Sequence, residues 1–194
     1  MVEQQIPPSA LLSAISEAFT FPVDGIQATT AALESWAKRK GPDASDEVRD
    51  LLAASRELFD ATEAQLAYTR LFIGSFQMEA PPYASYYMDG GLIGGKTTSE
   101  VRAVYRQFDI EISDERRVPE DHLRYLLAFL SLMAMRFEQT QQEAFVESYE
   151  DFRDGYVLPW LPAFVERVKT HAEQAYYGKL ADFTLAVLEG ETPC

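Results

Sequence analysis

The sequence predicts an all-α protein, a single-domain helical bundle around a central buried helix. Apolar residues recur at spacings of three and four along most of the 194 residues, whereas the alternation typical of strands is almost missing. One stretch, "LRYLLAFLSLMAM", is apolar on nearly every side, as expected of a helix surrounded by others. The length suits one sizeable core, so we expect residues 1–194 to form one all-helical domain.

The N-terminal third should contain three helical segments, each with a recognisable start or stop. Leu12, Ile15 and Phe19 share one face of the first segment, and Trp36 lies on the apolar face of the second. The segments are expected from a cap at Ser9 to a stop at Pro22, from Asp24 to a stop at Gly41, and from Ser45 or Asp46 to Gly74.

Five further helices are expected in the rest of the chain. The segment "FDIEIS" between the first two alternates briefly, but it has no neighbouring partner strand and is expected to be a connector. The expected helices are "SEVRAVYRQF" capped by Thr98, the central helix from Leu123 to Phe137, one carrying Phe145 to Tyr156, "LPWLPAFVERV", and "YYGKLADFTLAVLEG" ending at Gly190.

The segment Ser75–Thr97 breaks this periodicity. It is rich in Gly, Pro and Tyr, and structureless loops beyond about 12–15 residues are uncommon in compact domains unless they are functional or disordered. Its aromatic content argues against disorder. We therefore expect it to pack back onto the helices as a candidate binding element.

Composition and charge exclude several classes of protein. A formal charge of −14, from 31 acidic and 17 basic residues, argues against nucleic-acid binding. No apolar run approaches the roughly 20 residues of a membrane-spanning helix, and the N-terminus resembles neither a signal nor a transit peptide. The only cysteine is Cys194, and His122 and His171 lack accompanying metal-ligand motifs, so we expect no disulfide, metal or cofactor. Together these features favour a cytoplasmic protein.

The octapeptide Gly90–Thr97, "GGLIGGKT", matches the phosphate-loop pattern G-x-x-x-x-G-K-[ST]. That mechanism needs a buried strand before the loop and an aspartate-ended strand elsewhere to hold Mg²⁺. Neither is predicted, so a glycine-rich turn before a helix is the favoured interpretation. Nucleotide binding or hydrolysis at this loop remains an alternative.

Asp121 and His122 stand directly before the central helix, where a catalytic dyad, a metal ligand, a helix cap and the edge of a binding site are all conceivable. If Pro119 is the first helical residue, Glu120 and Asp121 lie in the first turn and complement the helix dipole. That explanation accounts for the carboxylates but gives no special reason for the histidine.

Four short motifs resemble, in order, those of the TorD/DmsD/NarJ-type redox-enzyme chaperones. They are "YTRLF" at 68–72, "APPYASYY" at 80–87, "PEDHL" at 119–123 and "LPWLPAF" at 158–164. The resemblance spans about residues 68–188. It implies a cytoplasmic, non-enzymatic chaperone that binds the N-terminal, often twin-arginine, leader of an apo molybdopterin oxidoreductase subunit and assists cofactor insertion before export. One departure is Tyr156, where the family often has histidine.

Carried over motif by motif, the resemblance implies a peptide-binding region formed by Leu71, Phe72, Pro82, Tyr83, Pro119, Asp121 and His122. A twin-arginine leader has a basic segment followed by an apolar one, so its binder needs carboxylates beside an apolar groove. Glu120 and Asp121 are the expected carboxylates. A purely structural helical adaptor is the remaining alternative, and the sequence names neither the client enzyme nor the oligomeric state, monomer or helix-swapped dimer.

Overall fold

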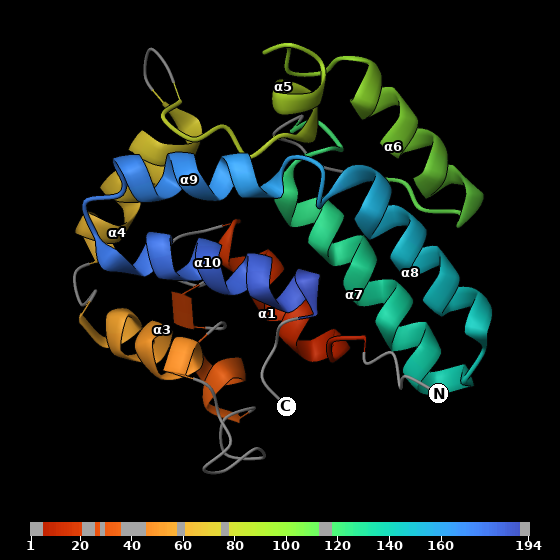
Figure 1. Ribbon diagram of the computed structural model, residues 1–194, viewed down its shortest axis with the longest axis horizontal. Coiled ribbons are helices and arrows are strands. Elements are labelled where there is room, and N and C mark those ends of the chain that lie inside the picture. The colour runs from red at the N-terminus through yellow and green to blue at the C-terminus, as the bar shows by residue number, and fades with distance from the viewer. Residues whose placement is uncertain are drawn as a thin grey trace.

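The computed structural model describes residues 6–20, 26–27, 30–35, 46–57, 61–74, 78–112 and 118–190, which form one helical bundle (Figure 1). These residues contain no strand, and their single β-bridge joins Tyr83 to His122. The prediction of an all-α bundle around a central buried helix is confirmed. None of the described helices is both long and apolar enough to cross a membrane.

The helices of the described residues follow one another along the chain. In order they are α1 (Ser9–Ala18), α3 (Asp46–Glu57), α4 (Ala61–Tyr68), the π-helix η2 (Thr69–Ile73), α5 (Ala84–Met88), α6 (Lys96–Gln107), α7 (Leu123–Thr140), α8 (Glu143–Tyr156), α9 (Leu161–His171) and α10 (Ala175–Glu189). Residues 26–27 and 30–35 are also helical, whereas the expected boundaries Pro22, Asp24 and Gly41 and the side chain of Trp36 lie outside the described residues.

The central helix is α7, which packs against α1 on one side and α8 on the other (Figure 1). Its buried residues recur along most of its length, as expected of a helix surrounded by others. Two hydrogen bonds fix α1 along it: the Ser16 hydroxyl donates to the Arg124 carbonyl (2.7 Å), and the Ser131 hydroxyl donates to the Ser9 carbonyl (2.9 Å). The helix α10 packs against α3 and α9, which closes the other half of the bundle.

Two expected helix caps are wrong. The side chains of Ser9 and Thr98 form hydrogen bonds with residues far away in the sequence instead of capping their helices. Pro8 precedes α1, and the Ser9 hydroxyl instead donates to Glu138 (2.7 Å). Gly95 precedes α6, and Thr98 lies within its first turn. The central helix begins at Leu123, as its apolar stripe predicts, so Pro119 is not its first residue. Gly190 ends α10 in the left-handed conformation (φ 76°), as predicted.

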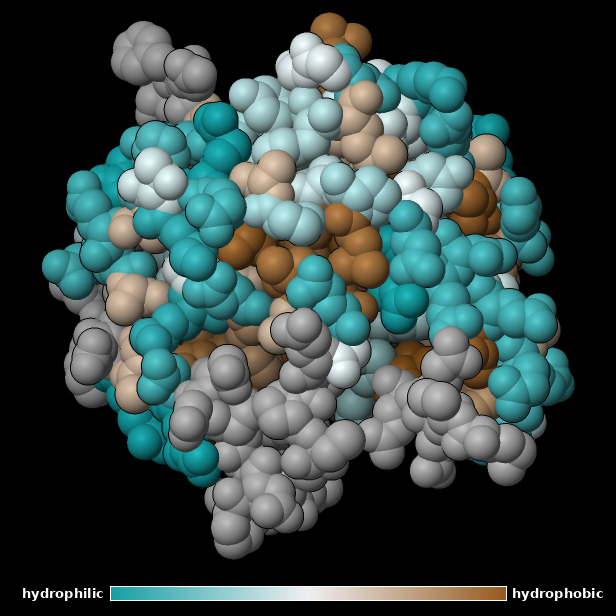
Figure 2. Space-filling model, in the orientation of Figure 1, coloured by the Kyte–Doolittle hydropathy of each residue, from teal (hydrophilic) through white to brown (hydrophobic). Residues whose placement is uncertain are grey.

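The segment expected to be a long loop contains the short helix α5 and folds back onto the bundle. Its buried anchors, Ala80 and Ala84, are fully shielded from solvent. Figure 2 shows a cluster of apolar side chains at the centre of the face where α7, α9 and α10 converge, with polar residues around it. Helix packing therefore leaves part of the apolar surface accessible.

Candidate functional site

Asp121 is fully buried, and both of its carboxylate oxygens accept hydrogen bonds from other segments. The Ser85 backbone N–H donates to Oδ2 (2.7 Å), and the Thr98 hydroxyl donates to Oδ1 (2.7 Å). Since α5 contributes Ser85 and α6 contributes Thr98, this one carboxylate joins two helices to the start of α7. The carboxylate that the sequence assigned to a basic leader at position 121 is therefore buried and already satisfied by two donors of the protein itself.

His122 is the N-cap residue of α7. Its extended backbone precedes the helix, and its Nδ1 accepts a hydrogen bond from the Arg124 backbone N–H (3.1 Å). A side-chain acceptor in this position satisfies one of the N–H groups that a helix start leaves without an intrahelical partner. The ring also packs nearly perpendicular to that of Tyr83, at a centroid distance of 5.0 Å. The cap explains why a histidine suits this position, which the sequence alone did not.

Pro82 and Tyr83 are held against this helix start by backbone hydrogen bonds. The Leu123 N–H donates to the Pro82 carbonyl (2.8 Å), and the Ala84 N–H donates to the Asp121 carbonyl (3.1 Å). The motif "APPYASYY" is therefore paired with "PEDHL" across the isolated β-bridge. The structure brings these two groups of predicted site residues together.

Pro119 and Glu120 remain partly exposed and line a small pocket of about 360 Å³ beside Arg102. Glu120 receives two hydrogen bonds from that guanidinium, at 2.6 and 2.9 Å. The hydrogen bond from Arg102 lowers the pKa of Glu120 below its ordinary value. Its negative charge is thus already paired within the chain.

Leu71 and Phe72 belong to the core, not to a groove. Both are buried, and the Phe72 ring contacts four other aromatic rings at centroid distances of 5.1–6.0 Å, those of Phe19, Tyr68, Phe164 and Tyr177. These two residues lie on η2, and the π-helical turn directs them inward while Thr69 and Arg70 line the surface. Single π-turns are frequent at functional sites.

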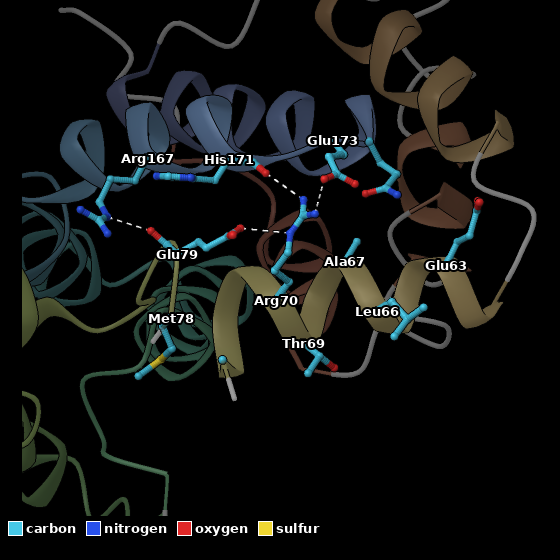
Figure 3. Close-up of a pocket in the computed structure, with 12 residues that line it drawn as sticks. Glu63, Leu66, Ala67, Thr69, Arg70, Met78, Glu79, Arg167, His171 and Glu173 are labelled. Carbon is cyan, nitrogen blue, oxygen red and sulfur yellow. Dashed lines mark hydrogen bonds and ion pairs between the residues drawn. The ribbon is translucent and has the colours of Figure 1, made fainter. Parts of the chain in front are cut away.

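The surface beside η2 is hollowed into a pocket of about 800 Å³ (Figure 3). One wall is the outer face of α4 and η2, and the opposite wall comes from the end of α9 and the turn that leads to α10. The side chains are those of Glu63, Leu66, Ala67, Thr69, Arg70, Met78, Glu79, Arg167, His171, Glu173 and Gln174, with Gly74 also at the lining. Charged groups and apolar side chains therefore occur in the same cavity.

Arg70 connects the walls of this pocket. Figure 3 shows its guanidinium between Glu79, Glu173 and the carbonyl of His171. Its Nε lies 3.1 Å from the Glu79 carboxylate, Nη1 pairs with Glu173, and Nη2 donates to the His171 carbonyl (2.9 Å). Arg167, on α9, donates to the backbone carbonyl of Glu79 (3.0 Å) and so holds the backbone at Glu79 against that helix.

The glycine-rich segment before α6 is arranged differently from a phosphate loop. Asp89 places its own carboxylate at the helix N-terminus, where it accepts from the Thr97 N–H and hydroxyl, both at 2.8 Å. A Cβ on Gly95 would collide with this carboxylate. Lys96 is exposed and pairs with Glu100 (2.9 Å). An anionic side chain thus occupies the position that a nucleotide phosphate would need.

The pocket's charged residues were missed by the sequence analysis. Arg70 stands inside the motif "YTRLF", and a charge within that apolar stretch was the available signal. The acidic partners Glu79 and Glu173 follow it by 9 and 103 positions, and no local pattern links them. His171, which the sequence analysis considered and set aside as a metal ligand, is exposed and lines the cavity. Among the described residues there is no cluster of three His, Cys, Asp or Glu side chains suited to a metal ion.

The fold is that of a redox enzyme maturation protein. A crystal structure described as such a protein, from Archaeoglobus fulgidus, matches 97% of this chain and 98% of its own chain with a TM-score of 0.65 and 25% sequence identity. The family model described as nitrate reductase delta subunit matches residues 26–166. The chain belongs to this TorD/NarJ family.

Similar proteins within the family are named as chaperones, not as enzymes. The chaperone protein TorD of Vibrio cholerae (strain ATCC 39541) is 32% identical over 158 residues, covering 77% of this chain and 72% of the relative. TorD of Vibrio parahaemolyticus is 30% identical over 148 residues, with coverages of 72% and 69%. The chaperone protein YcdY of Escherichia coli K12 is 31% identical over 135 residues, with coverages of 70% and 66%.

Proposed function

We propose that this protein is a cytoplasmic, non-enzymatic chaperone for one redox-enzyme system. Its client is the apo catalytic subunit of a molybdopterin oxidoreductase, and it binds the N-terminal twin-arginine leader of that subunit. Binding holds the subunit back from export until its cofactor is inserted and assembly is complete. The names of the related proteins support the chaperone role, and the pocket beside η2 supports the leader as ligand.

The observation that carries this proposal is the mixture of acidic and apolar groups in one cavity of about 800 Å³. Three glutamates and two arginines line it, so carboxylates outnumber guanidinium groups by one. Leu66 lines the same cavity with 65% of its surface exposed, and Ile73 follows two turns later with 58% exposed. A segment with basic residues followed by apolar ones complements both properties.

The seven residues named by the family resemblance have a positioning role in this proposal. Leu71 accepts a hydrogen bond from the Ala80 N–H (2.8 Å), which holds the backbone beside Glu79 against η2. The same segment continues to Pro82 and Tyr83, which pair with Leu123 and His122. The buried residues thereby fix the pocket wall that presents Glu79. Tyr83, Pro119 and Glu120 remain partly exposed and lie where this segment meets the start of α7.

The test uses a fluorescein-labelled synthetic peptide with two adjacent arginines followed by about ten apolar residues, a composition typical of leaders. Fluorescence anisotropy measures its affinity for the parent protein and for Leu66→Ala. Loss of an exposed apolar contact should weaken binding about fivefold, equivalent to about 1 kcal/mol. Leu92→Ala is the matched control, because Leu92 is 63% exposed and does not line this pocket.

Equal losses in the two variants would place the peptide elsewhere. Failure of the parent protein to bind the peptide would contradict the leader-binding role and favour a structural adaptor. Circular dichroism of both variants provides the folding control, and neither leucine is buried enough for its truncation to unfold the bundle.

A further inference from the structure

We infer that Arg70 is an internal substitute for a guanidinium group of the bound segment, and that a client arginine displaces it from Glu79 and Glu173. This inference rests on the proposed function and adds a residue that controls specificity. In the free protein Arg70 already forms the contacts that such a ligand would seek: two carboxylates and the carbonyl that ends α9. A side chain of the protein itself therefore occupies the position between the two carboxylates (Figure 3).

The fit of Arg70 in this position is incomplete. Its Nε and the Glu79 Oε2 are shielded from solvent and lie 3.1 Å apart, yet neither atom has a partner with hydrogen-bond geometry among the described residues. A shielded polar group without a well-formed hydrogen bond costs free energy, most of all when it is charged. A guanidinium approaching from another direction can align with Glu79 and recover that loss.

A second unmet acceptor lies in the same cavity. The Oε1 of Gln174 is shielded from solvent and has no donor among the described residues, although it lines the pocket beside Glu173. A guanidinium carries five N–H donors, so one arriving at Glu173 can also reach a neighbouring amide oxygen. The pocket thus has more acceptors than Arg70 alone satisfies.

The side chain of Arg70 can leave its position without crossing the core. It is 35% exposed and its partner Glu173 is largely exposed, so the released guanidinium would be hydrated at once. Replacement of one guanidinium by another keeps the charge of the pocket unchanged. The exchange therefore contributes selectivity for arginine, while the apolar part of the segment, against Leu66, contributes most of the affinity.

The exchange is tested with the arginine peptide described above and a second peptide in which citrulline, a neutral isostere, replaces both arginines. Removal of the internal competitor in Arg70→Gln should strengthen binding of the arginine peptide about fivefold and leave the citrulline peptide unchanged. Arg56→Gln is the control, because it also removes one positive charge, from the exposed pair between Arg56 of α3 and Glu34, and neither residue lines the pocket. It should alter neither affinity by more than about twofold.

The outcomes separate the two proposals. No binding of either peptide by the parent protein contradicts the proposed function. Binding by the parent with the same arginine-to-citrulline ratio in Arg70→Gln overturns the exchange and leaves the proposed function intact.

If Arg70→Gln fails to fold by circular dichroism, nuclear magnetic resonance of the parent protein decides the matter. The Arg70 Nε–H signal, assigned by its loss in Arg70→Lys, should move toward the position of free arginine when the arginine peptide is added and stay in place with the citrulline peptide. An unmoved signal during saturation with the arginine peptide overturns the inference.

Discussion

Replacement of Asp121 by alanine should destabilise the bundle severely, because two donors would lose their acceptor in a fully buried position. The Ser85 N–H and the Thr98 hydroxyl each donate to this carboxylate at 2.7 Å. An unsatisfied buried donor costs about 1–3 kcal/mol, so the two together predict a loss of about 2–6 kcal/mol in the free energy of unfolding. Against a typical total of about 5–15 kcal/mol, this is a large fraction.

Asp121→Asn should be much milder, at about 1 kcal/mol. Its oxygen can still accept from the Ser85 N–H, and its amide can donate to the Thr98 hydroxyl once that group turns to accept. The double variant Asp121→Ala with Thr98→Val should lose less than the sum of the two single changes, since valine leaves no hydroxyl unpaired. Urea unfolding followed by circular dichroism measures the parent protein and the four variants.

Two results would refute this reasoning. A cost below about 1 kcal/mol for Asp121→Ala would mean that water or a rearranged backbone satisfies both donors. Strict additivity in the double variant would mean that the Thr98 hydroxyl and the carboxylate do not depend on each other in solution.

Three further predictions concern neighbouring elements. In thermal unfolding, His122→Ala should lower the free energy of unfolding by about 1 kcal/mol. His122→Asn should lower it by less than half of that, because asparagine can still accept from the Arg124 N–H. Equal losses would argue against the cap. Calorimetry should detect no tight Mg-ATP or Mg-GTP binding, and a micromolar affinity abolished by Lys96→Ala would contradict this. The hydrogen bond from Arg102 lowers the pKa of Glu120 in the folded protein. The pair therefore stabilises the fold at pH values above the pKa of Glu120 in the unfolded chain. This stabilisation is lost as the pH falls through the lower pKa of the folded state. The stability difference between parent and Arg102→Gln should therefore be about 0.5 kcal/mol at neutral pH and shrink below about pH 4, and a difference that persists there would exclude the Glu120 charge as its source.

The order and character of the helices could be predicted because the governing signal is local. A helix places residues three and four apart on one face, so the stripe through Leu123, Leu126 and Leu130 is visible in the sequence and is buried in α7. Helix ends were less predictable. The hydroxyl groups of Ser9 and Thr98 suit caps, yet each donates to a residue more than twenty positions away.

The family motifs identified the right segments but not which side chains face outward. Asp121 has the sequence features of a helix-dipole partner, and only the packing of α5 and α6 over it makes it a buried acceptor. The burial of Leu71 and Phe72 was equally hidden in the sequence, because the π-helical turn of η2 determines which of its side chains enter the core.

The sequence by itself determined that this chain is an all-α bundle around the helix from Leu123, and its motifs placed it in its family. Only the tertiary structure decided that Arg70, Glu79 and Glu173 share one cavity, because Glu173 is 103 positions from Arg70 and reaches it through the turn between α9 and α10. Periodicity acts over a few residues along one helix, whereas a pocket arises where separate helices meet, and that depends on the packing of the whole core.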